Sequence, residues 1–211
     1  FGYGRIIRDG EGRVERIVEQ KDANAAEAAV TEGNSGFYCF DAQALFEALE
    51  QVGSDNAQGE FYLTYVLEIC RGAGRDVLAL PASDVSECLG VNSRVQLAAA
   101  TCALQSRINK EHMAAGVTMW DPTSVWIGPD VEIAPDVELL PQTFLLGKTQ
   151  VGEDSVIGPN TRLTDTVVGS GCTIDETVAI EARIDDEATC GPRAYLRPGA
   201  HLCEGAKAGT H

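Results

Sequence analysis

The sequence predicts an α/β segment followed by a parallel β-helix built from six-residue units. Three observations support this fold class. An aliphatic residue returns every six positions from about residue 120 onward, a long stretch without glycine or proline precedes this repeat, and residues 1–92 alternate strand-like with helix-like segments. Composition agrees, because 22 glycines and an aromatic content of only 6% favour a fold filled by small and β-branched side chains.

The six-residue period is the strongest signal in the chain. The recurring residues are Ile127, Ile133, Leu139, Leu145, Val151, Ile157 and Leu163, then, after a slip of one residue, Val168, Ile174 and Ile180, and after a second slip, Ile184, Cys190, Leu196, Leu202 and Ala208. A small or β-branched residue stands two positions before most of them, as Val125 does before Ile127 and Val178 before Ile180. We interpret each unit as a short strand and a turn, three of which close one coil, so that stacked coils bury a continuous core.

A β-sandwich is the alternative interpretation of many short strands. Its strands alternate with a period of two, and its turns recur at roughly 8–12 residues. Neither pattern produces a strict period of six, so the β-helix is favoured.

The stretch from Ser93 to Ala115 predicts one long helix, because it is rich in alanine, leucine, glutamine and arginine. Asn92 and Ser93 suit its beginning and Gly116 its end. Leu97, Leu104 and Ile108 share one face at helical spacing. The predicted domains are therefore residues 1–92, a linker helix at 93–116 and the β-helix at 117–211.

Residues 1–92 predict a mixture of strands and helices. The expected elements are a hairpin of Tyr3–Ile7 and Val14–Glu19, strands at Phe37–Phe40 and Asp76–Leu80, and helices at Asp41–Val52 and Glu60–Gly72. No phosphate-binding glycine loop with dinucleotide or P-loop spacing is present in this segment.

Charge and cysteine content narrow the possible partners and compartment. A net charge of −16 opposes the binding of nucleic acid and of anionic lipid, but binding of small anionic ligands remains possible. The 7 cysteines form no C-x-x-C pair, which predicts reduced and mostly buried thiols. No apolar run of membrane-spanning length and no signal peptide is visible, so a cytoplasmic protein is expected.

Several phrases along the chain resemble one bacterial family. They are GYGRIIRD, IVEQKDA, NSGFYCF, DNAQGEFYLT, LGVNSRVQLA and AGVTMWDP, followed by the hexapeptides and YLRPGA. In this order they resemble the bifunctional UDP-N-acetylglucosamine pyrophosphorylase and glucosamine-1-phosphate N-acetyltransferase, over essentially the whole chain. The resemblance implies the end of a Rossmann-like nucleotidyltransferase domain, then a left-handed β-helix. Because the chain opens without methionine and closes within a repeat, we expect an internal fragment.

The resemblance also implies two transferase activities. The first domain of the family moves uridylyl from UTP to N-acetylglucosamine 1-phosphate with Mg²⁺, and the β-helix, as a homotrimer, acetylates glucosamine 1-phosphate from acetyl-CoA. The product, UDP-N-acetylglucosamine, serves peptidoglycan and lipopolysaccharide synthesis. This fragment alone is expected to be inactive.

The family motifs point to five residues that bind UDP-N-acetylglucosamine or its sugar phosphate. By resemblance, Gly4 lets the backbone approach the sugar nucleotide, Glu19 accepts from sugar hydroxyls, Asn34 meets the N-acetyl group and Asn92 contacts Mg²⁺. Arg197 resembles the arginine that holds the sugar phosphate in the acetyltransferase site.

No catalytic residue is expected in this chain, because the family's acetyltransferase base would lie beyond His211. His112, His201 and His211 do not match it and are expected at the surface. Two positions depart from the family pattern: Tyr65 stands where aspartate is usual, and Arg193 stands where an aromatic residue is usual.

Two alternatives remain open at this point. One is a sugar-1-phosphate nucleotidyltransferase whose β-helix does not acetylate. The other is a non-catalytic trimerising scaffold, against which the ordered set of Gly4, Glu19, Asn34 and Asn92 argues.

Overall fold

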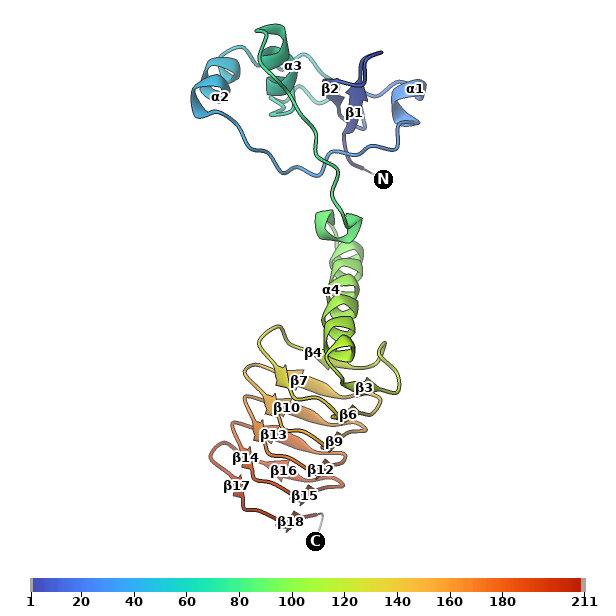
Figure 1. Ribbon diagram of the computed structural model, residues 1–211. Helices are drawn as coiled ribbons and strands as arrows, with labels where there is room; N and C mark the ends of the chain where they lie inside the picture. The colour runs from blue at the N-terminus through green and yellow to red at the C-terminus, as the bar shows by residue number, and fades with distance from the viewer. Residues whose placement is uncertain (1, 210–211) are drawn as a thin grey trace. The chain divides into compact units, whose positions relative to one another are not determined.

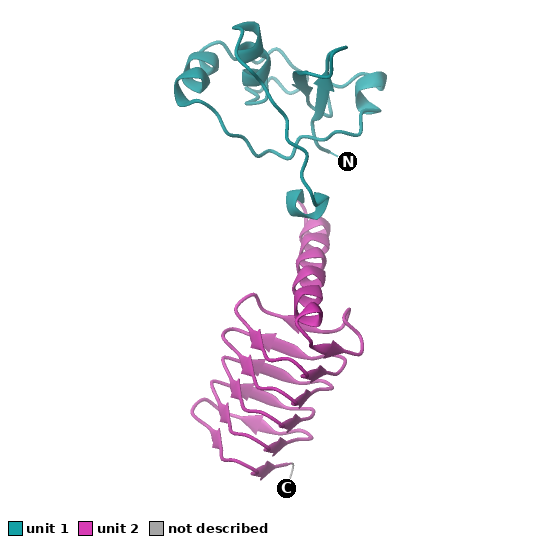
Figure 2. Cartoon of the chain, viewed as in Figure 1, with its two compact units in different colours: residues 1–90 teal, residues 91–211 magenta. Residues whose placement is uncertain are grey.

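The computed structural model describes residues 2–209, and the chain divides into two compact units, residues 1–90 and 91–211 (Figure 2). A small α/β region comes first, and a left-handed parallel β-helix with a helix at its beginning follows (Figure 1). The predicted fold class is confirmed. No helix within residues 2–209 has the length and apolar content needed to cross a membrane.

The first unit contains one antiparallel hairpin and three short α-helices. Their bounds are β1 Arg5–Arg8, β2 Val14–Val18, α1 Ala25–Ala28, α2 Ala42–Leu49, α3 Tyr65–Gly72 and the 3₁₀ helix η1 Val85–Cys88. Polar caps determine where the helices begin. Asn24 and Glu27 form a capping box at α1, and the Asp41 side chain accepts from the Ala44 amide at the start of α2. The helices expected at Asp41–Val52 and Glu60–Gly72 are thus present but shorter.

Asp9, in the turn between β1 and β2, ties the hairpin to α3. Its carboxylate accepts from the Arg13 amide at 2.9 Å and from Nη2 of Arg71 at 2.6 Å. The Arg13 amide contributes most to holding the pKa of Asp9 well below its usual range, and Arg71 adds to this effect.

The core of the first unit is small. Ala44, Ala48, Val66 and Cys70 form one cluster with a few half-buried neighbours, and Val14 and Ile17 of β2 are also buried. The predicted strands Phe37–Phe40 and Asp76–Leu80 are absent. Both segments lack a ladder partner among the described residues. Some of their large side chains point to solvent, with Phe37 77% and Leu80 89% exposed, whereas Phe40 and Val77 pack against the small core. An apolar run forms a strand only where a neighbouring strand completes its hydrogen bonds.

The second unit begins with helix α4, Arg94–Ala114, which confirms the predicted long helix. The Ser93 hydroxyl caps it by accepting from the Gln96 amide at 3.1 Å. The expected apolar face is only partly correct. Ile108 packs against the β-helix core, whereas Leu97 and Leu104 are 44% and 51% exposed.

Helix α4 is joined to the first coil by a buried amide. Asn109, 1% exposed, donates from Nδ2 to the carbonyl oxygens of Pro122 at 2.7 Å and Val125 at 3.0 Å. Gln105 in turn donates to Oδ1 of Asn109 at 2.7 Å. Every polar atom of the Asn109 side chain that faces the protein therefore has a partner.

The β-helix consists of three parallel sheets, one on each side of the coil (Figure 1). One sheet contains β4 Trp126–Ile127, β7 Phe144–Leu146, β10 Arg162–Thr164, β13 Val178–Ile180 and β16 Tyr195–Leu196. The second contains β5 Glu132–Ile133, β8 Gln150–Val151, β11 Val167–Val168, β14 Arg183–Ile184 and β17 His201–Leu202. The third contains β3 Thr118–Met119, β6 Glu138–Leu139, β9 Val156–Ile157, β12 Thr173–Ile174, β15 Thr189–Cys190 and β18 Lys207–Ala208.

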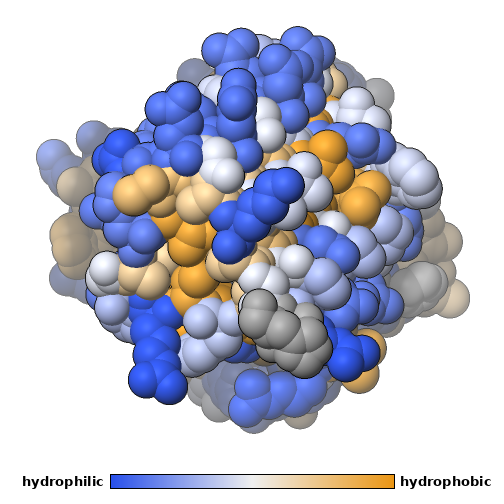
Figure 3. Space-filling model, turned by 90° about the horizontal axis from the view of Figure 1, so that it is seen from below, coloured by the Kyte–Doolittle hydropathy of each residue, from blue (hydrophilic) through white to orange (hydrophobic). Residues whose placement is uncertain are grey.

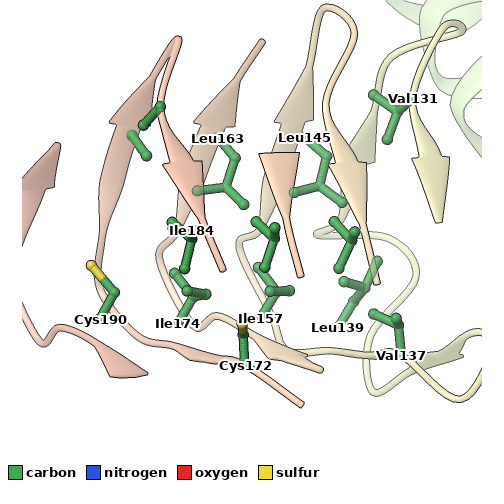
Figure 4. Close-up of a cluster of buried hydrophobic side chains, with 14 of the residues drawn as sticks. Val131, Val137, Leu139, Leu145, Ile157, Leu163, Cys172, Ile174, Ile184 and Cys190 are labelled. Carbon is green, nitrogen blue, oxygen red and sulfur yellow. The ribbon is translucent and has the colours of Figure 1, made fainter. Parts of the chain in front are cut away.

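The predicted inward residues form the core of this solenoid, in ladders that run from coil to coil (Figure 4). The prediction is wrong at one unit. Leu163 pairs with Ala179, which is fully buried together with Thr177, so Ile180 and Val178 are not the inward pair. The inward residues Ile174, Ala179 and Ile184 follow one another at intervals of five, so the repeat is one residue short both before and after Ala179.

The corners of the coils use left-handed backbone conformations and short hydrogen bonds between coils. Within residues 2–209, nine non-glycine residues have positive φ, among them Asp136, Asp154 and Arg193. The carboxylates of Asp165 and Asp186 accept from the amides of Lys148 and Ser170 on the preceding coils, at 2.9 and 2.8 Å. These bonds satisfy backbone groups that the turns leave outside the sheets.

At the end that carries β18, the core is less covered. Leu202 and Ala208 are only partly buried there, and apolar surface ringed by hydrophilic side chains is visible from that end (Figure 3). Fewer cysteines are buried than predicted: all seven are free, but only Cys70, Cys172 and Cys190 are buried, and Cys39, Cys102 and Cys203 are exposed.

Candidate functional site

Gly4 immediately precedes β1, where the backbone of the hairpin is tightly packed. A Cβ at this position would lie 2.9 Å from Cγ2 of Ile17 and 3.4 Å from Oε1 of Glu19. The absence of a side chain therefore lets β1 close onto β2, and it brings the Glu19 carboxylate beside the Gly4 backbone. Both a packing role and a close approach to a ligand fit this geometry.

Asn34 is joined to Gly4 through the backbone and to two further groups through its side chain. Its amide N–H donates to the Gly4 carbonyl at 2.8 Å. Its Oδ1 accepts from the Gly36 amide at 3.1 Å, and its Nδ2 donates to the Tyr38 hydroxyl at 2.7 Å. Gly36 has a φ of +82°, a conformation that glycine adopts without strain, so this turn requires it.

Glu19 follows β2 and is held by helix α3. Its Oε1 accepts from the hydroxyl of Thr64 at 3.3 Å, and Thr64, the N-cap residue of α3, is only 5% exposed. Three of the predicted site residues, Gly4, Glu19 and Asn34, therefore meet at one end of the hairpin.

A shallow depression of about 210 Å³ lies beside Glu19 along β2 and α3. Four of its eight lining residues are acidic and one is basic; they are Arg16, Ile17, Val18, Glu19, Asp22, Glu27, Tyr65 and Glu68. Such a surface offers acceptors to hydroxyl groups but repels phosphate.

The pKa values of two tyrosines near Glu19, Tyr38 and Tyr62, are raised. Burial raises the pKa of Tyr38, donation from Asn34 opposes this shift, and the negative charge of Glu19 adds to it. Burial also raises the pKa of Tyr62, with contributions from Asp22 and Glu60, and its buried hydroxyl has no hydrogen-bond partner among residues 2–209. Both hydroxyls therefore remain protonated at neutral pH and can donate.

Asn92 belongs to the second unit and precedes the cap of α4. It is exposed, and its backbone N–H donates to Oε1 of Gln96 at 2.7 Å. In the described part of the chain no group of three or more His, Cys, Asp or Glu side chains could hold a metal ion. A metal at Asn92 would therefore use its amide oxygen together with water or phosphate oxygens, which suits Mg²⁺ better than softer metals.

Arg197 lies in the exposed turn between β16 and β17. Its carbonyl accepts from the Ala200 amide at 2.9 Å, and its guanidinium has no protein partner among the residues described. Arg193, in the preceding turn, has a φ of +60° and forms an ion pair with Glu176 at 3.5 Å. Its charge is thus directed to the neighbouring coil.

The remaining residues that the sequence analysis singled out, Tyr65 and the histidines, contact other parts of the protein where the structure describes them. Tyr65, the first residue of α3, packs edge-to-face on Tyr62, with ring centroids 5.5 Å apart. His201 is exposed and pairs with Asp185 at 2.6 Å, and burial lowers the pKa of the half-buried His112. His211 lies outside the described residues.

Comparison with known proteins agrees with the motifs, although no family model matches the chain. Proteins named "Bifunctional protein GlmU" from Lactobacillus johnsonii and Brevibacillus brevis are each 49% identical, over 100% and 99% of this chain and 46% and 45% of their own lengths. The chain is GlmU-like. The GlmU protein of Streptomyces avermitilis is 50% identical, over 100% of the chain and 44% of its own length.

This GlmU-like chain spans less than half the length of the curated relatives it matches, 46% in the first of them. Within it, sequence reasoning did not single out Tyr38 and Thr64, the side chains that hold Asn34 and Glu19. Both lie inside the quoted phrases NSGFYCF and FYLT, so they could have been found by asking which neighbours support each polar residue.

Proposed function

We propose that this chain is part of a bifunctional enzyme that makes UDP-N-acetylglucosamine. The reactions are acetyl transfer from acetyl-CoA to glucosamine 1-phosphate and uridylyl transfer from UTP to N-acetylglucosamine 1-phosphate. The observation that carries the proposal is the convergence of Gly4, Glu19 and Asn34 at one end of the hairpin. The similarity to GlmU proteins over the whole chain supports it.

Each of these residues suits one part of an N-acetylated sugar. The Glu19 carboxylate accepts hydrogen bonds from sugar hydroxyls, and the Asn34 amide both donates and accepts, as recognition of an acetamido group requires. Gly4 leaves the backbone open to close approach by the sugar. Because the adjoining depression is acidic, the phosphates of the ligand are directed away from it.

In the uridylyl transfer, an oxygen of the sugar phosphate attacks the α-phosphorus of UTP and pyrophosphate leaves. A bound Mg²⁺ would neutralise the charge that builds on the phosphoryl oxygens. Asn92 is the residue here that would contact this ion through its amide oxygen.

The β-helix contributes to the second reaction. Arg197, exposed on its turn, presents a guanidinium that can bind a sugar phosphate through two parallel hydrogen bonds. Assembly as a homotrimer through the β-helix is part of the proposal. We propose no catalytic base within these residues, so the chain alone binds substrate without acetyl transfer.

The direct test is titration of the chain with UDP-N-acetylglucosamine by calorimetry. We expect binding by the wild type and a loss of about tenfold in affinity for Glu19→Gln, since a charged acceptor is removed from a sugar hydroxyl. Glu50→Gln, the same change at an exposed residue after α2, should leave the affinity unchanged.

Absence of binding by the wild type, together with trimer formation in sedimentation, would favour a scaffold over an enzyme. A second measurement compares pyrophosphate release, with Mg²⁺, by this chain and by a full-length GlmU relative. Turnover by the relative alone is expected.

A further inference from the structure

We propose that Tyr38 is a positioning residue that orients the side-chain amide of Asn34 for recognition of an N-acetyl group. The inference rests on the proposed function, because it concerns the same sugar site. It goes beyond that function by assigning to a residue with no expected role the selectivity for an acetamido sugar over a simple hexose.

The two ends of the Asn34 amide are distinguished by their partners. The Gly36 N–H can donate only to the oxygen end, and that contact is 3.1 Å. The Tyr38 hydroxyl lies 2.7 Å from the nitrogen end and accepts one of its two protons. Reversal of the amide would place two donors, the Gly36 N–H and the side-chain NH₂, against each other.

The remaining hydrogen-bonding capacity of Asn34 complements an acetamido group. A side-chain amide has two N–H donors and two lone pairs on its oxygen. With one of each already used, Asn34 retains one donor and one lone pair. An N-acetyl group offers a carbonyl acceptor and an N–H donor, so both pairs can be completed at once.

The Tyr38 ring is itself held in place. It is half-buried and stacks on Phe40, with centroids 5.6 Å apart and an interplanar angle of 24°. Tyr38→Phe therefore removes the hydroxyl while keeping the stacked ring. Without the Tyr38 hydroxyl as acceptor, the Asn34 side-chain amide regains rotational freedom. Its free donor and lone pair are then no longer held in the orientation that binds the acetamido group.

The experiment is a double-mutant cycle on the 211-residue chain, with Tyr38→Phe, Asn34→Ala and the double variant. Affinities for UDP-N-acetylglucosamine and UDP-glucose are measured by calorimetry. We expect Tyr38→Phe to weaken UDP-N-acetylglucosamine about fivefold, to change UDP-glucose less than twofold, and to have no further effect once Asn34 is alanine. Tyr195→Phe, an exposed tyrosine of the β-helix, is the matched control and should change neither affinity.

Equal weakening of both ligands, or a full additional loss in the double variant, would overturn the role of Tyr38 while leaving the proposed function intact. Failure of the wild type to bind either ligand overturns the proposed function, and the inference with it. A ligand-free check uses NMR: the Asn34 side-chain NH₂ signals should shift in Tyr38→Phe, and unchanged signals would contradict the positioning role.

Discussion

Gly128 and Gly152 occupy the same place in the repeat, directly after an inward aliphatic residue, but their surroundings differ. A Cβ on Gly152 would lie 2.6 Å from the carbonyl carbon of Gly169 and 2.7 Å from the amide nitrogen of Ser170 on the next coil. A Cβ on Gly128 would have its nearest neighbours at 3.6 Å, an ordinary contact. Substituting alanine for each glycine in turn therefore distinguishes the cost of crowding the next coil from the cost of losing a glycine at this place in the repeat.

We predict that Gly152→Ala destabilises the β-helix by about 1–3 kcal/mol, because backbone of the adjacent coil must shift to admit the methyl group. Gly128→Ala should change stability by less than about 1 kcal/mol, because the added methyl group would lie at ordinary van der Waals distances from its neighbours. Urea unfolding followed by circular dichroism measures both. Equal destabilisation by the two variants would show that the coils tolerate a wider spacing at Gly152.

For single residues, the six-residue period predicts most inward positions of the β-helix correctly, but it predicts the wrong residue where a corner is one residue shorter. The period predicts Ile180 as an inward residue, yet Ala179 takes that place because β13 pairs with β10 at a shorter separation than earlier strands do. Val178, Ala179 and Ile180 are all apolar, so the hydrophobicity pattern does not reveal which of them points inward after the shortened corner. Only the pairing of the strands decides it.

Helix α4 shows how a single polar residue can determine the contact between two elements. Its sequence predicted the length of the helix well, because propensity and a serine cap are local. The buried residues Gln105 and Asn109 were not foreseen, since buried amides look like solvent-facing residues in a sequence. Conversely, the helical spacing of Leu97, Leu104 and Ile108 predicts a packed face, but only Ile108 packs, and Leu97 and Leu104 are exposed.

We predict that Asn109→Ala destabilises the second unit by about 3 kcal/mol, because the buried carbonyl groups of Pro122 and Val125 lose their donor. Lys110→Ala, at the next and exposed position of the same helix, should have a small effect. Thermal unfolding of the two variants makes the comparison. A loss below about 1 kcal/mol for Asn109→Ala would mean that water replaces the amide.

At the scale of the whole chain, the two units have very different cores. Among the described residues, twenty apolar side chains are buried in residues 91–211, whereas six are buried in residues 1–90. The predicted strands at 37–40 and 76–80 failed for a related reason, because local sequence cannot state whether a pairing partner is available. The site residues were found through family motifs, while Tyr38 and Thr64 required the tertiary structure.

We predict that the two units unfold separately on heating, with residues 1–90 first, since they bury far less apolar surface. Both tryptophans, Trp120 and Trp126, lie in the second unit, so tryptophan fluorescence reports on that unit alone. Far-UV circular dichroism reports on both. The first dichroism transition should precede the fluorescence transition, and a single coincident transition would contradict this expectation.

The spacing of paired strands along the chain bears on how the solenoid forms. Trp126 pairs with Phe144, 18 residues away, and Arg162 with Val178, 16 residues away, so neighbouring coils are always separated by a similar length of chain. Each added coil therefore closes a loop of nearly constant size, and its entropic cost does not grow with the length of the solenoid. Folding can then propagate coil by coil from one nucleus, and relative contact order falls as the solenoid lengthens.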